Sequence, residues 1–257
     1  MALLSVREAT KRFGGLLANE AISFDVEEGE LLAVIGPNGA GKTTLFNVIS
    51  GAYPPTSGSI HFDGRDITGA SPHGVAHAGL VRTYQLVQLF KNLTVAENVE
   101  IGSHRVTRGG VFSALFRPHW MQQQEKSVSV GARELLRFVG LEAQADDPAD
   151  TLPYGRQRLL EVARALAARP RLLLLDEPAA GLNTQETEAL AEVISRIHLG
   201  GTTVILIEHD MSLVMKIAQR IVVLDFGKKI AEGAPDEIKS HPDVIAAYLG
   251  GTEILDA

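Results

Sequence analysis

The chain has 257 residues, of which 45% are hydrophobic and 21% are charged, and its formal net charge is −7. Such a chain can bury a full hydrophobic core, either as one large domain or as a domain with a sizeable insertion. No apolar run approaches the roughly 20 residues that span a bilayer. The absence of cysteine excludes disulfides and thiolate zinc sites, and the acidic balance disfavours broad binding to nucleic acid.

Alternating apolar and polar residues near the start predict two strands, at residues 3–8 and 21–26. A turn at Gly14-Gly15 separates them, and Phe13 lies just before this turn. Two interpretations remain open for the Phe13 ring: a partly buried anchor, or a surface on which a nucleotide base stacks.

A glycine-rich segment lies between a predicted buried strand at residues 31–35 and a predicted helix at residues 44–49. It fits G-x-x-x-x-G-K-[ST], the phosphate-binding loop of P-loop NTPases. The glycines let backbone N–H groups surround an anion, Lys42 can reach the β- and γ-phosphates, and the Thr43 hydroxyl can bind Mg²⁺. The sequence therefore predicts that ATP binds at Gly36, Pro37, Asn38, Gly39, Ala40, Gly41, Lys42, Thr43 and Thr44.

The character of the chain changes between residue 85 and about residue 150. Residues 94–101 and 121–138 have helical periodicity and strand-like runs are missing, which predicts a helical insertion. Within it, residues 102–120 carry three arginines and three aromatic residues but no acid. A solvated loop and an interface beside anionic lipid headgroups both remain open for this stretch. The residues concerned are Arg105, Arg108, Arg117, Phe112, Phe116 and Trp120.

The second half of the chain alternates helical and strand patterns, which predicts an α/β fold built on parallel strands. The predicted helices are residues 156–168, 184–197 and 235–249, and the predicted strands are residues 172–175, 202–207, 221–224 and 228–231.

Charged side chains follow two of these buried strands, at the strand ends where ligands bind in open α/β sheets. Asp176 comes directly after residues 172–175 and is placed to hold Mg²⁺, directly or through water. Glu177 follows it and can orient or deprotonate a water for attack on the γ-phosphate. His209 comes after the strand at residues 202–207, where it can contact the γ-phosphate.

Together these motifs resemble the nucleotide-binding subunit of an ABC transporter along nearly the whole chain. Residues 36–44 resemble Walker A and residues 172–177 resemble Walker B. The resemblance implies that Gln85 is the Q-loop glutamine, a catalytic residue and Mg²⁺ ligand, that His209 is the switch histidine, and that Phe13 stacks on adenine. It also implies that a signature segment seals the ATP held by a second subunit. The residues of that segment are Leu152, Pro153, Tyr154, Gly155 and Arg156.

The resemblance implies an α/β P-loop NTPase fold with a RecA-like core, an N-terminal antiparallel β subdomain and an inserted helical subdomain. Residues 1–257 are then a single ABC ATPase domain. The catalytic core with its β subdomain is expected at residues 1–85 and 156–257, and the helical signature subdomain at residues 86–155.

Four short segments are more narrowly similar to the ATPases of branched-chain amino-acid importers. The resemblance implies ATP and Mg²⁺ as cofactors, closure of a homo- or heterodimer, and attachment to integral membrane permease subunits at the cytoplasmic face of the membrane. A solute-binding protein is then an indirect partner, and nucleic acid is not a partner. An exporter-type ATPase and a soluble ABC ATPase of DNA repair or translation remain alternatives. The segments are residues 81–85, 176–183, 207–211 and 242–250.

The signature segment departs from the family pattern at two positions. Pro153 replaces the signature serine, which removes a hydroxyl and an N–H group, and Arg156 replaces the glutamine. Gly155 and the N-terminus of the following helix remain, so backbone and dipole contacts to a phosphate are still expected.

Overall fold

The computed structural model describes residues 2–83, 88–103 and 119–249, except for the side chains of residues 119–122 and 249. Gln85 therefore lies outside the described residues. The arginines and the aromatic side chains of residues 102–120 lie outside them as well. What the sequence predicts for these residues stays a prediction.

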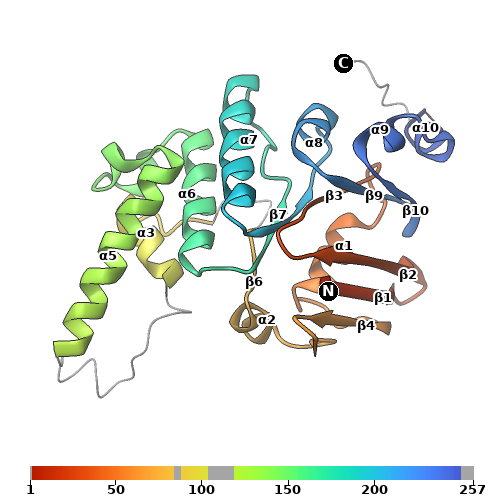
Figure 1. The fold of residues 1–257 in the computed structure, drawn as a ribbon, viewed down its shortest axis with the longest axis horizontal. Coiled ribbons are helices and arrows are strands. Elements are labelled where there is room, and N and C mark those ends of the chain that lie inside the picture. Colours follow the sequence, from red (N-terminus) through yellow and green to blue (C-terminus); the bar gives the residue numbers. More distant parts are fainter. Residues whose placement is uncertain (1, 84–87, 104–118, 250–257) are drawn as a thin grey trace.

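Among the described residues, six strands form the central sheet, in the order β10-β9-β3-β8-β7-β6 (Figure 1). Neighbouring strands are parallel except for β10, which runs antiparallel to β9. Every residue of β3, β7 and β8 is buried, as expected for parallel strands that are covered on both faces. The strands are β3 (Leu31–Ile35), β6 (Leu80–Arg82), β7 (Leu172–Asp176), β8 (Thr203–Ile207), β9 (Arg220–Asp225) and β10 (Lys228–Gly233).

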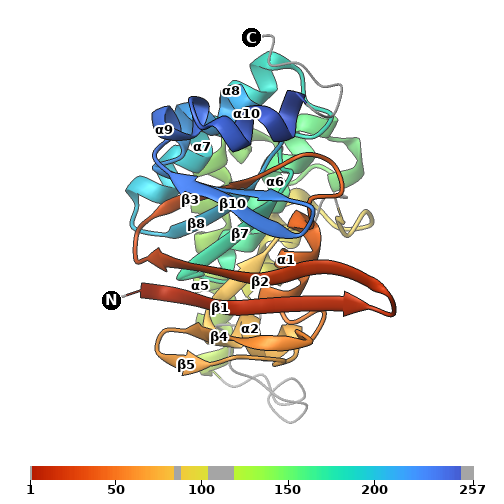
Figure 2. The same ribbon diagram turned by 90° about the vertical axis from the view of Figure 1, so that its right-hand side faces the viewer.

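A second sheet is antiparallel, with the order β2-β1-β4-β5 (Figure 2). Helix α1 (Lys42–Ile49) lies between the two sheets, and its Leu45 and Phe46 belong to a core cluster that includes residues of both. This packing holds α1 in place after the loop that follows β3. The strands of this sheet are β1 (Ala2–Phe13), β2 (Leu16–Glu27), β4 (Ser57–Phe62) and β5 (Arg65–Asp66), and the short helix α2 (Pro72–Ala78) follows.

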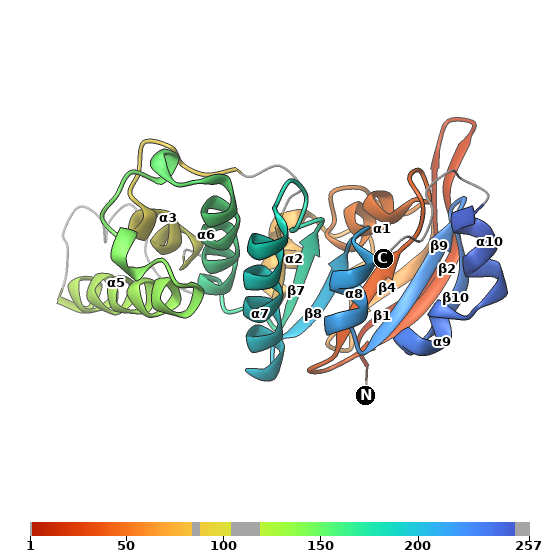
Figure 3. The same cartoon turned by 90° about the horizontal axis from the view of Figure 1, so that it is seen from above.

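Four helices cover the opposite face of the central sheet (Figure 3). Their apolar residues, among them Leu190, Val214 and Ile238, form one core cluster with the side chains of the strands. No helix of the described residues is long and apolar enough to cross a membrane. The covering helices are α7 (Thr184–Leu199), α8 (Met211–Ile217), α9 (Pro235–Lys239) and α10 (Pro242–Leu249).

Three further helices form a group at one end of the molecule (Figures 1 and 3). Helix α6 (Tyr154–Ala167) packs against both α3 (Val95–Gly102) and α5 (His119–Val139). Short 3-10 turns at Glu142–Gln144 and Ala149–Thr151 connect α5 to α6. We propose this group as the helical subdomain, and the proposed boundary at residue 155 then falls within the first turn of α6.

The P-loop α/β architecture, with an antiparallel β subdomain and a helical group, is confirmed, but one predicted helix is different. Residues 235–249 form two helices rather than one. Pro242 cannot donate a backbone hydrogen bond, and a proline disfavours helical backbone at the preceding residue. The N–H of His241 accordingly bonds to the carbonyl of Ile238 at 3.2 Å, and a new helix begins at Pro242.

Candidate functional site

The loop between β3 and α1 has the backbone that the glycine pattern requires. Gly36 has a φ of 150°, and a Cβ there would collide with the carbonyl oxygen of Leu224 in β9. Gly41 has a φ of 95°, and a Cβ there would collide with the carbonyl oxygen of Ala18 in β2. Any side chain at either position would push the loop away from its neighbours, which explains the two glycines.

The Lys42 side chain lies inside this loop. Its Nζ donates hydrogen bonds to the carbonyl oxygens of Gly36, at 2.6 Å, and Pro37, at 3.0 Å. The first turn of α1 contains no acidic residue. The ammonium group of Lys42 and the positive end of the eight-residue helix α1 therefore both lie at this loop. This arrangement suits a polyanion such as a triphosphate.

A cavity of about 350 Å³ opens beside the loop and brings Walker A together with Glu177. One wall comes from the start of β2, and another comes from the turn between β9 and β10. The lining residues are Leu16, Leu17, Ala18, Asn38, Gly39, Ala40, Gly41, Lys42, Thr43, Thr44, Glu177, Phe226 and Gly227.

Phe13 is not among the residues that line this cavity in the described part of the chain. Its ring packs edge-on against Tyr53, with centroids 5.4 Å apart, and Lys11 Nζ lies 5.0 Å from the Phe13 centroid. Instead, the exposed large apolar side chains at the cavity are those of Leu16, which is 67% exposed, and Phe226, which is 87% exposed.

The sequence analysis missed Phe226 as a site residue, although it predicts the strands on either side, at residues 221–224 and 228–231. Phe226 and Gly227 have φ values of 42° and 80°, the two positive values of a tight hairpin turn. The Gly227 N–H bonds to the carbonyl of Ala40 at 3.1 Å, and the Gly227 carbonyl accepts from the N–H of Glu20 at 2.8 Å. The turn is thus attached to Walker A. A bulky apolar residue at the first position of a two-residue hairpin turn, where Asn, Asp or Gly is usual, is the signal that could have drawn attention to it.

Asp176 ends β7 and is almost completely buried. Its Oδ2 accepts from Arg82 Nη2 at 2.6 Å, whereas its Oδ1 has no hydrogen-bond partner among the described atoms. A buried carboxylate oxygen without a partner is costly unless a further ligand completes it. Asp176 therefore fits the predicted role at a magnesium ion, which prefers oxygen ligands and keeps several waters.

Within the described residues, no group of three or more His, Asp or Glu side chains could hold a metal by itself. This agrees with Mg²⁺ sites in which one or two protein ligands act together with phosphate oxygens. Thr43, in the first turn of α1, lines the same cavity as Glu177.

Glu177 has the positive φ of 46°, which is unfavourable for a side chain of this size. Its N–H bonds to the carbonyl of Ile207 at 2.9 Å, which attaches the strained residue to β8. Strain of this kind concentrates at functional sites, where the surrounding structure maintains it. The backbone thereby turns out of the sheet, and Glu177 lines the cavity.

His209 follows β8, and its side chain is 60% exposed. Glu208, immediately before it, is fully buried. Its carboxylate accepts hydrogen bonds from the backbone N–H groups of Ala179, in the turn after β7, and of His209. Burial raises the pKa of Glu208 above its ordinary value, because a buried carboxylate is less stable when ionised. The sequence analysis assigns no role to Glu208.

The predicted signature segment lies at the start of α6, apart from the cavity. Pro153, Tyr154 and Arg156 are exposed, whereas Leu152 and Gly155 are buried. A Cβ on Gly155 would meet the carboxylate of Glu186 in the first turn of α7. The Tyr154 ring lies close to Gly181, in the loop before α7. The segment is therefore held against the loop that follows Walker B.

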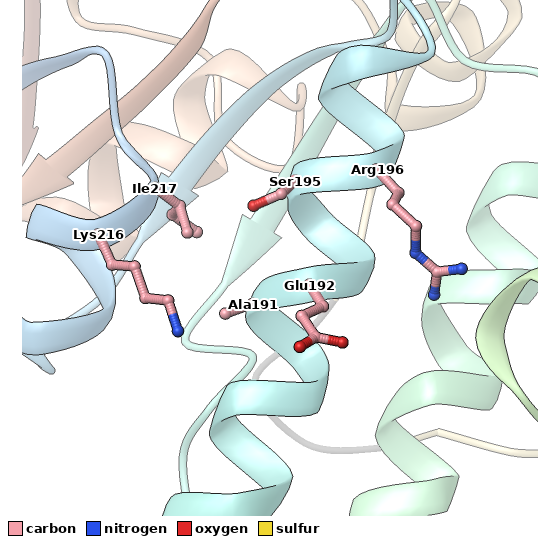
Figure 4. A pocket seen from close by; sticks show the side chains of 6 residues that line it. All are labelled: Ala191, Glu192, Ser195, Arg196, Lys216 and Ile217. Atoms are coloured by element: carbon pink, nitrogen blue, oxygen red, sulfur yellow. The ribbon is translucent and has the colours of Figure 1, made fainter.

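A separate groove of about 380 Å³ lies between α7 and α8 (Figure 4). It contains none of the glycine-rich backbone that binds phosphate, and its polar side chains belong to helix surfaces. We do not include it in the site. Its lining residues are Ala191, Glu192, Ser195, Arg196, Lys216 and Ile217.

Comparison with known proteins identifies the family. The family model described as ABC transporter matches residues 19–180, a span that includes both Walker motifs and the signature segment. This chain belongs to the ABC transporter ATP-binding family. A second model, described as branched-chain amino acid ATP-binding cassette transporter, matches residues 228–254.

Individual relatives of this ABC ATPase agree with the family match. It is 46% identical over 249 residues to the high-affinity branched-chain amino acid transport ATP-binding protein BraF of Pseudomonas aeruginosa, covering 96% of this chain and 98% of the relative. It is 44% identical over 250 residues to LivG of Escherichia coli K12, with the same coverage. As a member of this family, the chain is an ATP-hydrolysing enzyme.

Solved structures agree on the fold of the ABC ATPase. A nucleotide-free ATP-binding cassette from an ABC transporter is 33% identical, with a TM-score of 0.83, covering 96% of this chain and 99% of that chain. The ADP conformation of an ATP-binding cassette is 32% identical, with a TM-score of 0.84, covering 97% of this chain and 99% of that chain.

Proposed function

We propose that this chain is the ATP-binding and hydrolysing subunit of an ABC importer for branched-chain or related amino acids. The observation that carries the proposal is the single cavity lined by Lys42, Thr43 and Glu177. An ammonium group for phosphate, a hydroxyl for Mg²⁺ and a carboxylate for the attacking water surround one space there. The amino-acid class is supported by the names of BraF and LivG and by the second family description.

The proposed hydrolysis divides the work among the Walker A loop, Glu177, His209 and the residues that would hold Mg²⁺. Loop N–H groups and Lys42 hold the β- and γ-phosphates, with Lys42 exchanging its bonds to the loop carbonyls for phosphate oxygens. The Glu177 carboxylate orients the attacking water and accepts its proton. His209 contacts the γ-phosphate. Bound Mg²⁺ would neutralise charge on the phosphate oxygens, and Thr43, Asp176 and Gln85 would hold it.

The proposal includes a second ATPase subunit. None of the residues 152–156 is among the described residues that line the cavity of their own chain. Pro153, Tyr154 and Arg156 are exposed at the N-terminus of α6, whose first turn contains no acidic residue. ATPases of this family dimerise, and we infer that the signature segment meets the ATP of a partner, which is either a second copy or a related subunit.

The adenine base is proposed to lie against the exposed apolar side chains that line the cavity. These are Leu16 and Phe226, both of which are highly exposed for their size. Phe13 remains the residue that the family resemblance implies. The Phe13 ring packs against Tyr53, and Phe13 pairs with Leu16 where β1 meets β2.

The partners outside the ATPase pair are proposed to be integral membrane permease subunits, contacted from the cytoplasmic face, together with a solute-binding protein that acts through them. Copurification from detergent-solubilised membranes tests this. The chain should copurify with integral membrane proteins, and branched-chain amino acids with their binding protein should raise the ATPase activity of the reconstituted complex. An active ATPase that copurifies with no membrane protein would overturn the transport proposal and favour a soluble ABC ATPase.

A further inference from the structure

A fully buried carboxylate connects the two segments that carry Glu177 and His209. Glu208 Oε1 accepts a hydrogen bond from the N–H of Ala179 at 2.7 Å. Its Oε2 accepts from the N–H of His209 at 3.1 Å and lies 3.8 Å from the Nδ1 atom of the same residue. One side chain therefore holds together the turn after β7 and the backbone N–H of His209, the second residue after β8.

The connection begins where the pairing of the two strands ends. The last residue pair of the β7–β8 ladder is Asp176 with Ile207. Beyond it the Glu177 N–H still bonds to the Ile207 carbonyl, but Glu177 has left-handed backbone and cannot continue the strand. The Glu208 side chain then provides the acceptor for Ala179 that a strand backbone would otherwise provide.

Only a carboxylate can make both contacts without conflict. Each of its oxygens accepts, whereas the amide of a glutamine has one accepting oxygen and one donating NH₂ group. At this position the NH₂ group would face a backbone N–H. A buried carboxylate is also costly, as the raised pKa of Glu208 indicates, and a residue that only filled space would avoid that cost.

We propose that Glu208 is a positioning residue for ATP hydrolysis, which fixes His209 relative to the turn that follows Glu177. It does not touch the Walker A cavity, whose described lining residues do not include it. Its effect is therefore on the rate of the chemical step and not on nucleotide binding. Because it acts through His209, removing His209 should remove most of its influence.

The test is a double-mutant cycle with Glu208→Gln, His209→Ala and the double variant in the full-length protein. Glu208→Gln should lower kcat roughly tenfold or more, since small displacements of catalytic groups are costly, with KM for ATP changed by less than about twofold. The double variant should be no slower than His209→Ala alone. Glu237→Gln is the control, because Glu237 accepts a backbone N–H bond at a helix start outside the cavity lining.

Two results would overturn the proposal: an unchanged kcat in Glu208→Gln, or a double variant slowed by the product of the single effects. Hydrogen exchange at Ala179 gives a readout that does not depend on activity. Exchange should accelerate in Glu208→Leu, which removes the acceptor. The same variant replaces Glu208→Gln in the cycle if the latter does not fold, because an apolar residue of similar size removes the buried charge. Unchanged exchange in Glu208→Leu would also contradict the proposal.

Discussion

Arg82 joins the end of β7 to the helix that follows Walker A. Its guanidinium donates to Asp176 at the end of β7, to Asn47 Oδ1 in α1 at 2.7 Å, and to Ser50 Oγ just after α1 at 3.0 Å. Both partners of the Arg82–Asp176 ion pair are almost fully buried. The planar fork of arginine suits three acceptors that come from different elements, and lysine could not reproduce it.

Arg82→Ala should therefore lower the free energy of unfolding by about 3–5 kcal/mol, since removal of one member leaves a buried charge without compensation. Urea unfolding measures this. The control is Arg137→Ala, which breaks an ion pair with Glu142 on the exposed surface and should leave stability nearly unchanged. Equal effects of the two substitutions would contradict the structural importance of Arg82.

Phe226 and Phe13 can be distinguished by their effect on base binding. Phe226→Asn should weaken ATP binding by roughly tenfold, because base–aromatic stacking contributes about 1–3 kcal/mol, while asparagine still tolerates the positive φ at this turn. Binding of inorganic tripolyphosphate, which has no base, should not change. If Phe13→Ser weakens ATP binding and Phe226→Asn does not, the adenine base stacks on Phe13, as the family resemblance implies.

At the scale of elements, the start of α6 is the point where the family pattern and the structure can be compared directly. Pro153 is the N-cap residue of this helix, and no side chain caps its first turn. A serine at this position offers a hydroxyl that bonds either to the N–H groups of the first turn or to a phosphate. Helix α6 thus begins at a residue that lacks the side-chain oxygen with which N-cap residues usually accept a hydrogen bond from the first turn.

Pro153→Ser should stabilise the protein by about 1 kcal/mol through the new cap. It should also tighten ATP-driven dimerisation, because a hydrogen bond to a charged group contributes about 1.5–3 kcal/mol. Thermal unfolding and sedimentation with ATP measure the two effects. Pro153→Ala is the matched control, since it removes the ring without adding a hydroxyl. Dimerisation that is the same in both variants would mean that backbone and helix dipole already suffice.

Local patterns and long-range packing differ in what the sequence could predict. The Walker A loop is predictable from the spacing of its glycines and its Lys-Thr pair, although the backbone atoms that exclude a Cβ at Gly36 and Gly41 belong to β9 and β2. Arg82 contacts a residue that is 94 positions away, and only the pairing of β6 with β7 brings them together. Phe226 likewise lies beside Walker A only because of packing between segments that are far apart in the sequence. Pro242, by contrast, was a local signal for the break between α9 and α10.

At the scale of the whole molecule, the residues proposed to contact ATP lie on two separate surfaces. One surface is the cavity that joins Walker A to Glu177, and the other is the exposed start of α6, in the helical group beside α7 (Figure 3). Two chains that close on ATP would bring these surfaces together. Hydrolysis would remove the γ-phosphate that both surfaces contact, so that the pair reopens.

Glu177→Gln should separate these two steps. The amide cannot accept the proton of the attacking water but keeps the size of the side chain, so ATP binding should remain while turnover falls at least a hundredfold, in line with the contribution of a general base. The variant should then accumulate as an ATP-bound dimer, detected as a doubling of mass in sedimentation with ATP and none with ADP. Glu188→Gln, on the exposed surface of α7, is the control and should behave as the unaltered protein. Near-normal turnover in Glu177→Gln would mean that a residue other than Glu177 accepts the proton of the attacking water. Loss of turnover without any dimer would contradict the proposed closure of two chains on ATP.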